Sequence, residues 1–375
     1  MSWVASDFDS NHSTARRTLS SLLHIDLPLL IGLLFLAALG LIILYSAGNQ
    51  HMDLITRQLT RFGIGFTLMF MIAQISPRQL KAWTPWVFSV GVLMLIAVLV
   101  IGEGKGANRW LDFHFVRFQP SEIMKLAMPL MIAWFFADTA LPPRASRILQ
   151  ALVLIVVPSV LVAKQPDLGT ALLIGVAGLV VLLFAGIRWK VIFGFGFLVI
   201  AALPLLWYGM HDYQRQRVLT FLNPEADPLG AGWHIVQSKI AIGSGGLYGK
   251  GWLNGSQAHL EFLPERTTDF IFAVFSEEFG LFGILIMLAL YLYVIGRGLY
   301  IASQAQDTFG RLLAGSLTIT FFFNIFVNIG MVTGLLPIVG LPLPLISYGG
   351  TSLVTMMASF GMLMSVQTHR KFIAT

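Results

Sequence analysis

The chain has 375 residues, a formal net charge of +6 and no cysteine. Hydrophobic residues make up 56% of it, and the mean hydropathy is +0.78. This composition excludes a soluble globular protein, and the lack of thiols excludes disulfides, thiolate catalysis and Cys-ligated metal sites. Lipid cannot satisfy backbone N–H and C=O groups, so membrane spans must be helices or a closed barrel. The apolar runs are continuous rather than alternating, which indicates helices.

The apolar runs predict an all-α polytopic membrane protein with about ten transmembrane helices. The expected spans are 27–46, 60–76, 84–101, 121–137, 148–163, 168–187, 190–210, 269–296, 310–334 and 344–367. A large outer loop, about 211–268, is expected between the seventh and eighth spans. No small-residue cleavage site follows the first span, which favours an anchor over a removed signal peptide.

The short loops predict the orientation, because Lys and Arg concentrate on the cytoplasmic side of membrane proteins. With a cytoplasmic N-terminus, every cytoplasmic segment receives two cations, namely Arg16/Arg17, Arg78/Lys81, Arg144/Arg147, Arg188/Lys190, Arg297/Arg311 and Arg370/Lys371. We therefore expect cytoplasmic tails at 1–26 and 369–375, flanking a ten-helix membrane domain at 27–368.

The same orientation leaves many cations on or just inside the outer face, where topology does not require them. They are Arg57, Arg61, Lys105, Arg109, Arg117, Lys125, Lys164, Arg215, Arg217, Lys239, Lys250 and Arg266. An anionic ligand bound at the outer face would explain this excess. The alternative is pairing with the outer carboxylates, which nearly match these cations in number.

Two turns precede predicted spans on the outer side. Pro120-Ser121-Glu122 is typical of a helix start, and Glu122 shares a helix face with Lys125 at i, i+3. These two side chains either neutralise each other inside the membrane or line a cavity at a reaction site. Gln165–Thr170 predicts a tight turn in which Asp167 caps the following helix.

The outer loop is rich in glycine, with Gly243, Gly245, Gly246, Gly249 and Gly251 close together. Glycines let backbone N–H groups approach an anion, and neighbouring lysines would neutralise it, so this stretch could bind a diphosphate. The alternative is that the glycines only form turns.

Asp269 stands where the polar outer loop meets a long apolar run. A carboxylate there is costly, and an ionisable residue inside a membrane is a functional hypothesis by default. The alternative is that Asp269 caps the helix and interacts with its dipole. Glu277 and Glu278 lie deeper in the same predicted helix and are interpreted as mainly structural.

The stretch Asn328–Ser352 contains three prolines and five glycines. Such a stretch breaks a membrane helix, and irregular backbone at that depth is tolerated only where protein buries it or where it lines a cavity. We expect a re-entrant or broken-helix element that faces a substrate. The alternative is a buried turn that only packs between helices.

These residues resemble a known family. The stretch Asn328–Ser352 is similar to the C-terminal signature of the SEDS proteins (shape, elongation, division and sporulation). Three other stretches agree with that family: Arg117–Glu122 with Lys125, Gln165–Thr170, and Leu263–Glu265 with Thr268–Phe272. The resemblance extends over essentially the whole chain. It is strongest to the elongation members, on the basis of His211–Arg217, Ala231–Lys239 and Arg266; Thr267 departs from a position where His is common.

The resemblance implies a peptidoglycan glycosyltransferase that polymerises lipid II at the outer face of the bacterial inner membrane, during elongation and rod-shape maintenance. It also implies a complex with a class B penicillin-binding protein and other elongation proteins, with membrane lipid around it and no nucleic acid. The essential loop aspartate of the family corresponds to Asp269, and its helix-four pair corresponds to Glu122 and Lys125.

The implied reaction forms a β-1,4 bond from an α-linked undecaprenyl-diphosphate donor, so the anomeric centre inverts. Asp269 is the expected general base, because the acceptor 4-hydroxyl must lose a proton. The expected substrate-binding residues are Arg109, Glu122, Lys125, Arg217, Lys239 and Ser347. A divalent cation, Mg or Mn, could help to neutralise the diphosphate, although no ligand cluster is evident. A lipid II flippase and a non-catalytic scaffold of the elongation machinery are the alternatives.

Overall fold

The computed structural model describes residues 24–101, 110–112, 117–165, 167–188, 212–223, 231–259 and 265–369, with scattered residues between 191 and 209. The described membrane helices are α2 Leu27–Ala47, α3 Met52–Ala73, α4 Pro77–Ile101, α5 Pro120–Ala137, α6 Ala145–Lys164, α7 Leu168–Phe184, α12 Ile271–Ser303, α13 Thr308–Val332 and α14 Thr351–Thr368. The outer loop contributes α9 Asp212–Leu222, α10 Ala231–Ser244 and α11 Ser256–His259. Two short strands, β1 Leu111–Asp112 and β2 Arg117–Phe118, pair antiparallel before α5.

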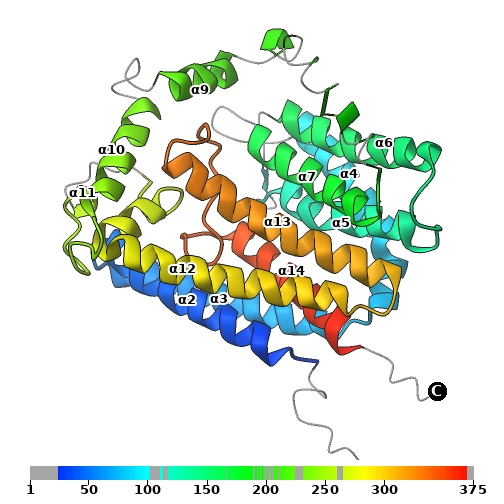
Figure 1. Ribbon diagram of the computed structural model, residues 1–375, viewed down its shortest axis with the longest axis horizontal. Helices are drawn as coiled ribbons and strands as arrows, with labels where there is room; N and C mark the ends of the chain where they lie inside the picture. Colours follow the sequence, from blue (N-terminus) through cyan, green and yellow to red (C-terminus); the bar gives the residue numbers. More distant parts are fainter. Residues whose placement is uncertain are drawn as a thin grey trace, which may run out of the picture.

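Helix α13 is the centre of the bundle. It packs against α12, α7 and α5, while α2 lies along α12 and α3 lies along α14 (Figure 1). One buried apolar cluster joins α2, α3, α12 and α14, and a second joins α4 to α7; α13 contributes to both. The rings of His24 and His369 stack at 4.1 Å, so the two ends of the helical domain meet on one side of the bundle.

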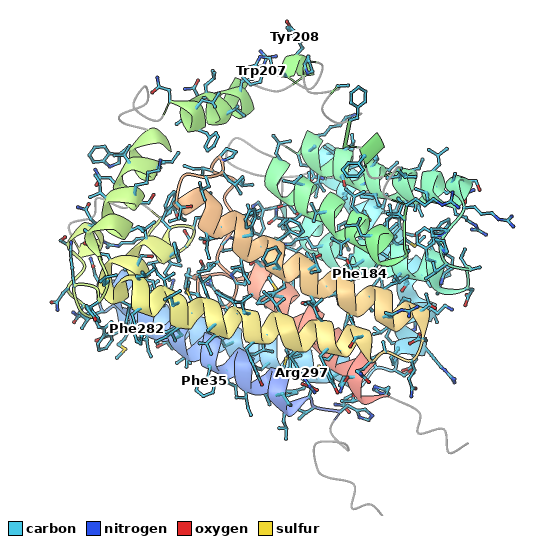
Figure 2. The ribbon with its side chains drawn as sticks, viewed as in Figure 1. Phe35, Phe184, Trp207, Tyr208, Phe282 and Arg297 are labelled. Atoms are coloured by element: carbon cyan, nitrogen blue, oxygen red, sulfur yellow. The ribbon has the colours of Figure 1, made fainter. Side chains whose placement is uncertain are left out.

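The outer surface of the bundle is apolar. Among the described helices α2, α4, α6, α12 and α13 are long and apolar enough to cross a membrane, and α7 is apolar but shorter. Large hydrophobic side chains point away from the bundle, such as Phe35 at 60% exposed and Phe282 at 63% (Figure 2). Exposure of this apolar surface to water would be unfavourable, whereas contact with lipid would not. The chain is therefore a multi-pass membrane protein.

The predicted spans follow the described helices in order, but α4 begins at Pro77 rather than at 84, α12 ends at Ser303 rather than at 296, and the starts of α3 and α14 also differ. Helix α3 begins at Met52 rather than at 60, because its first turns are helical but polar, with Asp53 and Arg57 exposed. Helix α14 begins at Thr351 rather than at 344. Most of the predicted seventh span, 190–210, lies outside the described residues, as do nearly all of both predicted tails.

The delayed start of α14 reflects its prolines and glycines. Residues Thr333–Gly350, here called the broken segment, form no regular helix between α13 and α14. Pro342 and Pro344 lack the N–H that a helix needs, and Gly334 and Gly340 have φ values of 73° and 78°. Much of the segment is nevertheless buried, as irregular backbone within a membrane must be. The predicted helix break is confirmed.

Candidate active site

The broken segment holds the backbone just ahead of α12. The Ser347 hydroxyl donates a hydrogen bond to the Thr268 carbonyl at 2.6 Å, and the Tyr348 N–H donates to the Thr267 carbonyl at 2.8 Å. The Ser347 oxygen also accepts a hydrogen bond from the Leu343 N–H at 2.8 Å. The Ser347 hydroxyl therefore fixes the backbone just ahead of Asp269.

Asn328 of α13 adds the third contact to the same backbone. Its Nδ2 donates to the Asp269 carbonyl at 3.0 Å and to the Leu341 carbonyl at 2.6 Å, and its side chain is fully buried. The Asp269 carboxylate faces Gly340, since a Cβ placed there would lie 3.5 Å from Oδ2. Asp269 is partly exposed. The broken segment and α13 thus fix the main chain of Asp269 and form a wall beside its carboxylate.

The helix-capping alternative needs Asp269 at the N-cap of α12, but Asp269 stands one residue before the N-cap. Helix α12 begins at Ile271, and its N-cap is Phe270. Asp269 therefore precedes the cap, where a side chain can face a cavity instead of the first turn.

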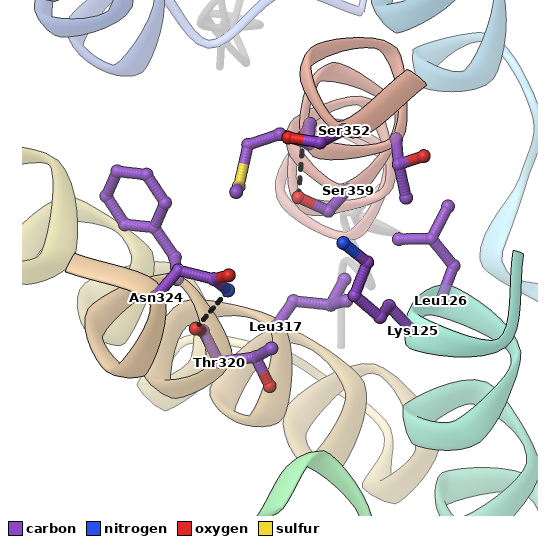
Figure 3. A pocket seen from close by; sticks show the side chains of 10 residues that line it. Lys125, Leu126, Leu317, Thr320, Asn324, Ser352 and Ser359 are labelled. Carbon is purple, nitrogen blue, oxygen red and sulfur yellow. Dashed lines mark hydrogen bonds between the residues drawn. The ribbon is translucent and has the colours of Figure 1, made fainter. Parts of the chain in front are cut away.

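Glu122 and Lys125 form an ion pair inside the bundle. The Lys125 Nζ lies 2.8 Å from the Glu122 carboxylate, and the two side chains are 12% and 7% exposed. Lys125 also lines a cavity of about 350 Å³, measured with its open mouth, between α5, α13 and α14. Figure 3 shows its ammonium group pointing into this cavity between Asn324 of α13 and Ser359 of α14.

A second cavity continues the first toward the broken segment. It has about 230 Å³ with the open space at its mouth included, Ser347 is part of its lining, and it shares Ser352 and Met356 with the Lys125 cavity. We call the two together the polar hollow. It runs from the buried ion pair to Ser347, whose hydroxyl holds the residue before Asp269. Polar side chains such as Lys125, Asn324 and Ser352 stand among apolar ones on its wall, and these polar groups suit a ligand with hydroxyl or phosphate groups.

Lys239, another predicted site residue, does not line this hollow. Lys239 of α10 is exposed and packs beside Gly334, where a Cβ would lie 2.3 Å from its Cε. Arg109 lies outside the described residues, and so does the side chain of Arg217, which stands on α9. The structure therefore connects Ser347 with the Glu122–Lys125 pair through the hollow, and Asp269 stands next to Thr268, whose carbonyl Ser347 holds.

Several outer cations already have partners within the protein. Lys250 pairs with Glu277 at 2.6 Å, and Arg215 donates to the carbonyls of Trp207 and Tyr208 at 2.9 and 2.8 Å. Arg61 stacks over the ring of Tyr348 at 4.1 Å. Pairing with carboxylates therefore accounts for Lys250 and Lys125 among the outer cations, whereas Arg215 and Arg61 contact carbonyls and a ring.

The turn predicted at Gln165–Thr170 is confirmed. Asp167 is the N-cap of α7, and its carboxylate accepts a hydrogen bond from the Thr170 N–H at 3.2 Å. The same carboxylate accepts from Gln119 Nε2 at 3.1 Å, which joins the start of α7 to the start of α5. Asp167 therefore has a structural role beside the Glu122 helix.

Sequence reasoning missed the polar residues of α13 as site residues. Thr320, Asn324 and Asn328 follow one another at intervals of four, so they share one helix face. Thr320 and Asn324 line the hollow, and the buried Thr320 hydroxyl oxygen has no hydrogen-bond partner within the described part of the chain. Their polar side chains, spaced by four in an otherwise apolar helix, could have indicated a polar face directed at a site.

The described residues contain no group of three or more His, Asp or Glu placed to hold a metal ion. The ion pair and the hydroxyl and amide groups of the hollow are instead suited to a polar organic or phosphorylated ligand.

The chain is similar to characterised proteins along nearly its whole length. Residues 19–372 match the family model of FtsW, RodA and SpoVE, described as cell cycle proteins. The peptidoglycan glycosyltransferase MrdB of Escherichia coli K12 is 52% identical over 361 residues, which cover 96% of this chain and 98% of MrdB.

Solved structures agree with this similarity. A chain of a peptidoglycan synthase complex that coordinates polymerization and crosslinking has a TM-score of 0.80 at 29% identity, covering 92% of this chain and 99% of its own. The rod shape determining protein RodA of Thermus thermophilus has a TM-score of 0.70 at 27% identity, with coverage of 92% and 98%. The resemblance found in the sequence motifs is confirmed, and the chain belongs to the FtsW/RodA/SpoVE family.

Proposed function

We propose that this protein is a peptidoglycan glycosyltransferase that polymerises lipid II, with Asp269 as the general base. The main support is the placement of Asp269: three neighbouring carbonyls, ending with its own, are held by Ser347, Tyr348 and Asn328. A partly exposed carboxylate on such a fixed backbone is suited to accept a proton from a bound substrate.

The chemistry is an inverting displacement at the anomeric carbon of the donor sugar. The acceptor 4-hydroxyl loses its proton to the Asp269 carboxylate, and its oxygen forms the new bond to the anomeric carbon. The bond from that carbon to the diphosphate breaks, and the diphosphate leaves with the electron pair. A carboxylate is a weak base, which suffices when the proton moves late, after positive charge on the sugar ring has acidified the hydroxyl.

The departing diphosphate needs positive charge and hydrogen-bond donors. Lys125 supplies an ammonium group with N–H donors beyond the one that it directs at Glu122, and Asn324 lies across the same cavity. Lys239, Arg109 and Arg217 belong to the proposal as outer-loop cations that guide the anionic substrate to the hollow. A divalent cation would arrive with the diphosphate of the substrate.

The proposal also covers the membrane in which the protein lies and the protein with which it works. The protein lies in the bacterial inner membrane with both termini in the cytoplasm, which the paired cations of the short loops support. It works with a class B penicillin-binding protein during cell elongation, which the similarity to a chain of a peptidoglycan synthase complex supports.

The decisive experiment supplies lipid II to the purified protein, co-purified with its penicillin-binding partner, and measures glycan polymer. We expect Asp269→Asn to lower polymerisation about 10²- to 10⁴-fold. Asp53→Asn is the matched control, since Asp53 is an exposed carboxylate in the first turn of α3. Full activity of Asp269→Asn would contradict the role of the base. Lipid II translocation without polymer would favour a flippase, and partner binding without either activity would leave a scaffold.

A further inference from the structure

Helix α12 is broken at Gly280, within the first third of its length. Gly280 has φ 62° and ψ −163°, so α12 consists of a half-helix, Ile271–Phe279, and a longer helix that follows it. A continuous helix would join the Leu281 N–H to the Glu277 carbonyl and the Phe282 N–H to the Glu278 carbonyl. The break removes both of these hydrogen bonds.

The outer-loop segment Gly245–Gly251, here called the inserted loop, replaces them. Its main chain enters the break and satisfies both donors and both acceptors. The four hydrogen bonds are Lys250 N–H to Glu277 O (3.0 Å), Gly251 N–H to Glu278 O (3.0 Å), Leu281 N–H to Gly246 O (2.9 Å) and Phe282 N–H to Leu247 O (3.0 Å). Since unpaired backbone groups in an apolar environment cost several kcal/mol each, the break and the loop require each other.

The glycines of the inserted loop serve this close approach. A Cβ at Gly245 would lie 2.1 Å from the Ser276 carbonyl oxygen, and one at Gly249 would lie 2.1 Å from that of Glu278. A Cβ at Gly280 would lie 2.3 Å from the Gly249 nitrogen. Gly245 and Gly249, two of the five glycines considered for a diphosphate site, therefore pack the loop against α12.

The buried carboxylate of Glu277 binds the inserted loop through Lys250. The Glu277 side chain is fully buried, and its carboxylate accepts hydrogen bonds from Lys250 Nζ at 2.6 Å, Ser256 Oγ at 3.0 Å and the Gln257 N–H at 3.2 Å. A buried carboxylate needs such compensation, and Lys250 is the cation that provides it. The pair joins the inserted loop to the last turn of the half-helix.

We propose that Lys250 and Glu277 are positioning residues for Asp269, an inference that rests on the proposed function. The half-helix is held at one end by this pair and at the other by the contacts of Asn328 and Ser347. Asp269 stands two residues before the start of the half-helix at Ile271, and Glu277 lies six residues, about 9 Å, further along it. Rotation or sliding of the half-helix would move the carboxylate of Asp269 relative to the polar hollow, and a displacement of about 1 Å can cost about 10²-fold in rate.

The test compares Lys250→Met with Lys250→Arg in the full chain co-purified with its penicillin-binding partner. We expect Lys250→Met to lower kcat for lipid II polymerisation about 10- to 100-fold with KM within about twofold, and Lys250→Arg to recover most of that loss. Lys81→Met is the matched control, because it removes the cation of the Lys81–Asp138 pair, whose carboxylate is 84% exposed.

Hydrogen exchange of the half-helix provides a readout that does not depend on catalysis. Amides of Ile271–Phe279 should exchange faster in Lys250→Met and as slowly as in the parent protein in Lys250→Arg and Lys81→Met. Unchanged kcat and unchanged exchange in Lys250→Met would overturn the inference. A general loss of thermal stability with kcat and KM changed together, unrescued by arginine, would also overturn it. If Asp269→Asn retains activity, the proposed function fails while the exchange result still tests whether the Lys250–Glu277 pair holds the half-helix.

Discussion

The ion pair between Glu122 and Lys125 allows the sharpest test of the polar hollow. Replacing Lys125 by methionine keeps the length of the side chain but leaves the Glu122 carboxylate, 7% exposed, without its cation. At 2.8 Å and an effective dielectric constant of about 20, the lost attraction is about 6 kcal/mol. Removal of one partner of a buried pair typically costs about 3–5 kcal/mol of stability, so Lys125→Met should unfold in detergent at a clearly lower temperature.

The double variant Glu122→Gln/Lys125→Met separates charge neutralisation from substrate binding. With both charges removed, we expect thermal unfolding close to that of the parent protein, because no uncompensated charge stays buried. Polymerisation should nevertheless remain about 10²- to 10³-fold lower, because the donor that Lys125 directs into the cavity is missing.

The assay is lipid II polymerisation with the penicillin-binding partner present, alongside thermal unfolding of the same preparations. Recovery of both stability and polymerisation in the double variant would refute the reasoning. Lys125 would then serve only to neutralise Glu122, which is the first of the two interpretations that the i, i+3 spacing allowed.

Two further predictions concern the backbone around Asp269 and the two ends of the helical domain. Asn328→Ala should cost about 1–3 kcal/mol of stability for each of the two buried carbonyls that it leaves without a donor; Asn324→Ala, which loses a bond only within its own helix, should cost less in the same thermal unfolding assay. Burial lowers the pKa of the His369 imidazole from its ordinary value of 6.5, so the folded state favours the neutral ring. The stability that depends on this ring should be complete above about pH 6.5 and should fall at lower pH, and His369→Gln should weaken that pH dependence; an unchanged pH profile would contradict the assignment.

Much of the fold followed from local properties of the sequence. Apolar runs of membrane length predicted where α2, α5, α6, α7 and α13 lie, because lipid requires continuous helices. Local chemistry also predicted the break before α14, since prolines remove the N–H donors that a helix uses. The Asp167 cap was equally predictable, because a cap depends on residues close in sequence.

The break in α12 was not predictable in this way. A glycine inside an apolar run is common, and neither Gly280 nor its neighbours indicate that the helix stops there. The break is stable only because the inserted loop supplies its hydrogen bonds from about 30 residues upstream. Glu277 was correctly interpreted as structural, but its partner Lys250 could not be named from helix geometry alone.

Asp269 shows the same division. Its residue type, its position at the edge of an apolar run and the motif around it were sufficient to select it from the sequence as the candidate base. The tertiary structure decided what holds it: Asn328, 59 positions after Asp269, donates to its carbonyl, and Ser347, 79 positions after Thr268, donates to the carbonyl of that neighbour. The physical reason is that residue type and hydropathy are local properties, whereas the donors for buried backbone carbonyls come from whichever helices pack beside them.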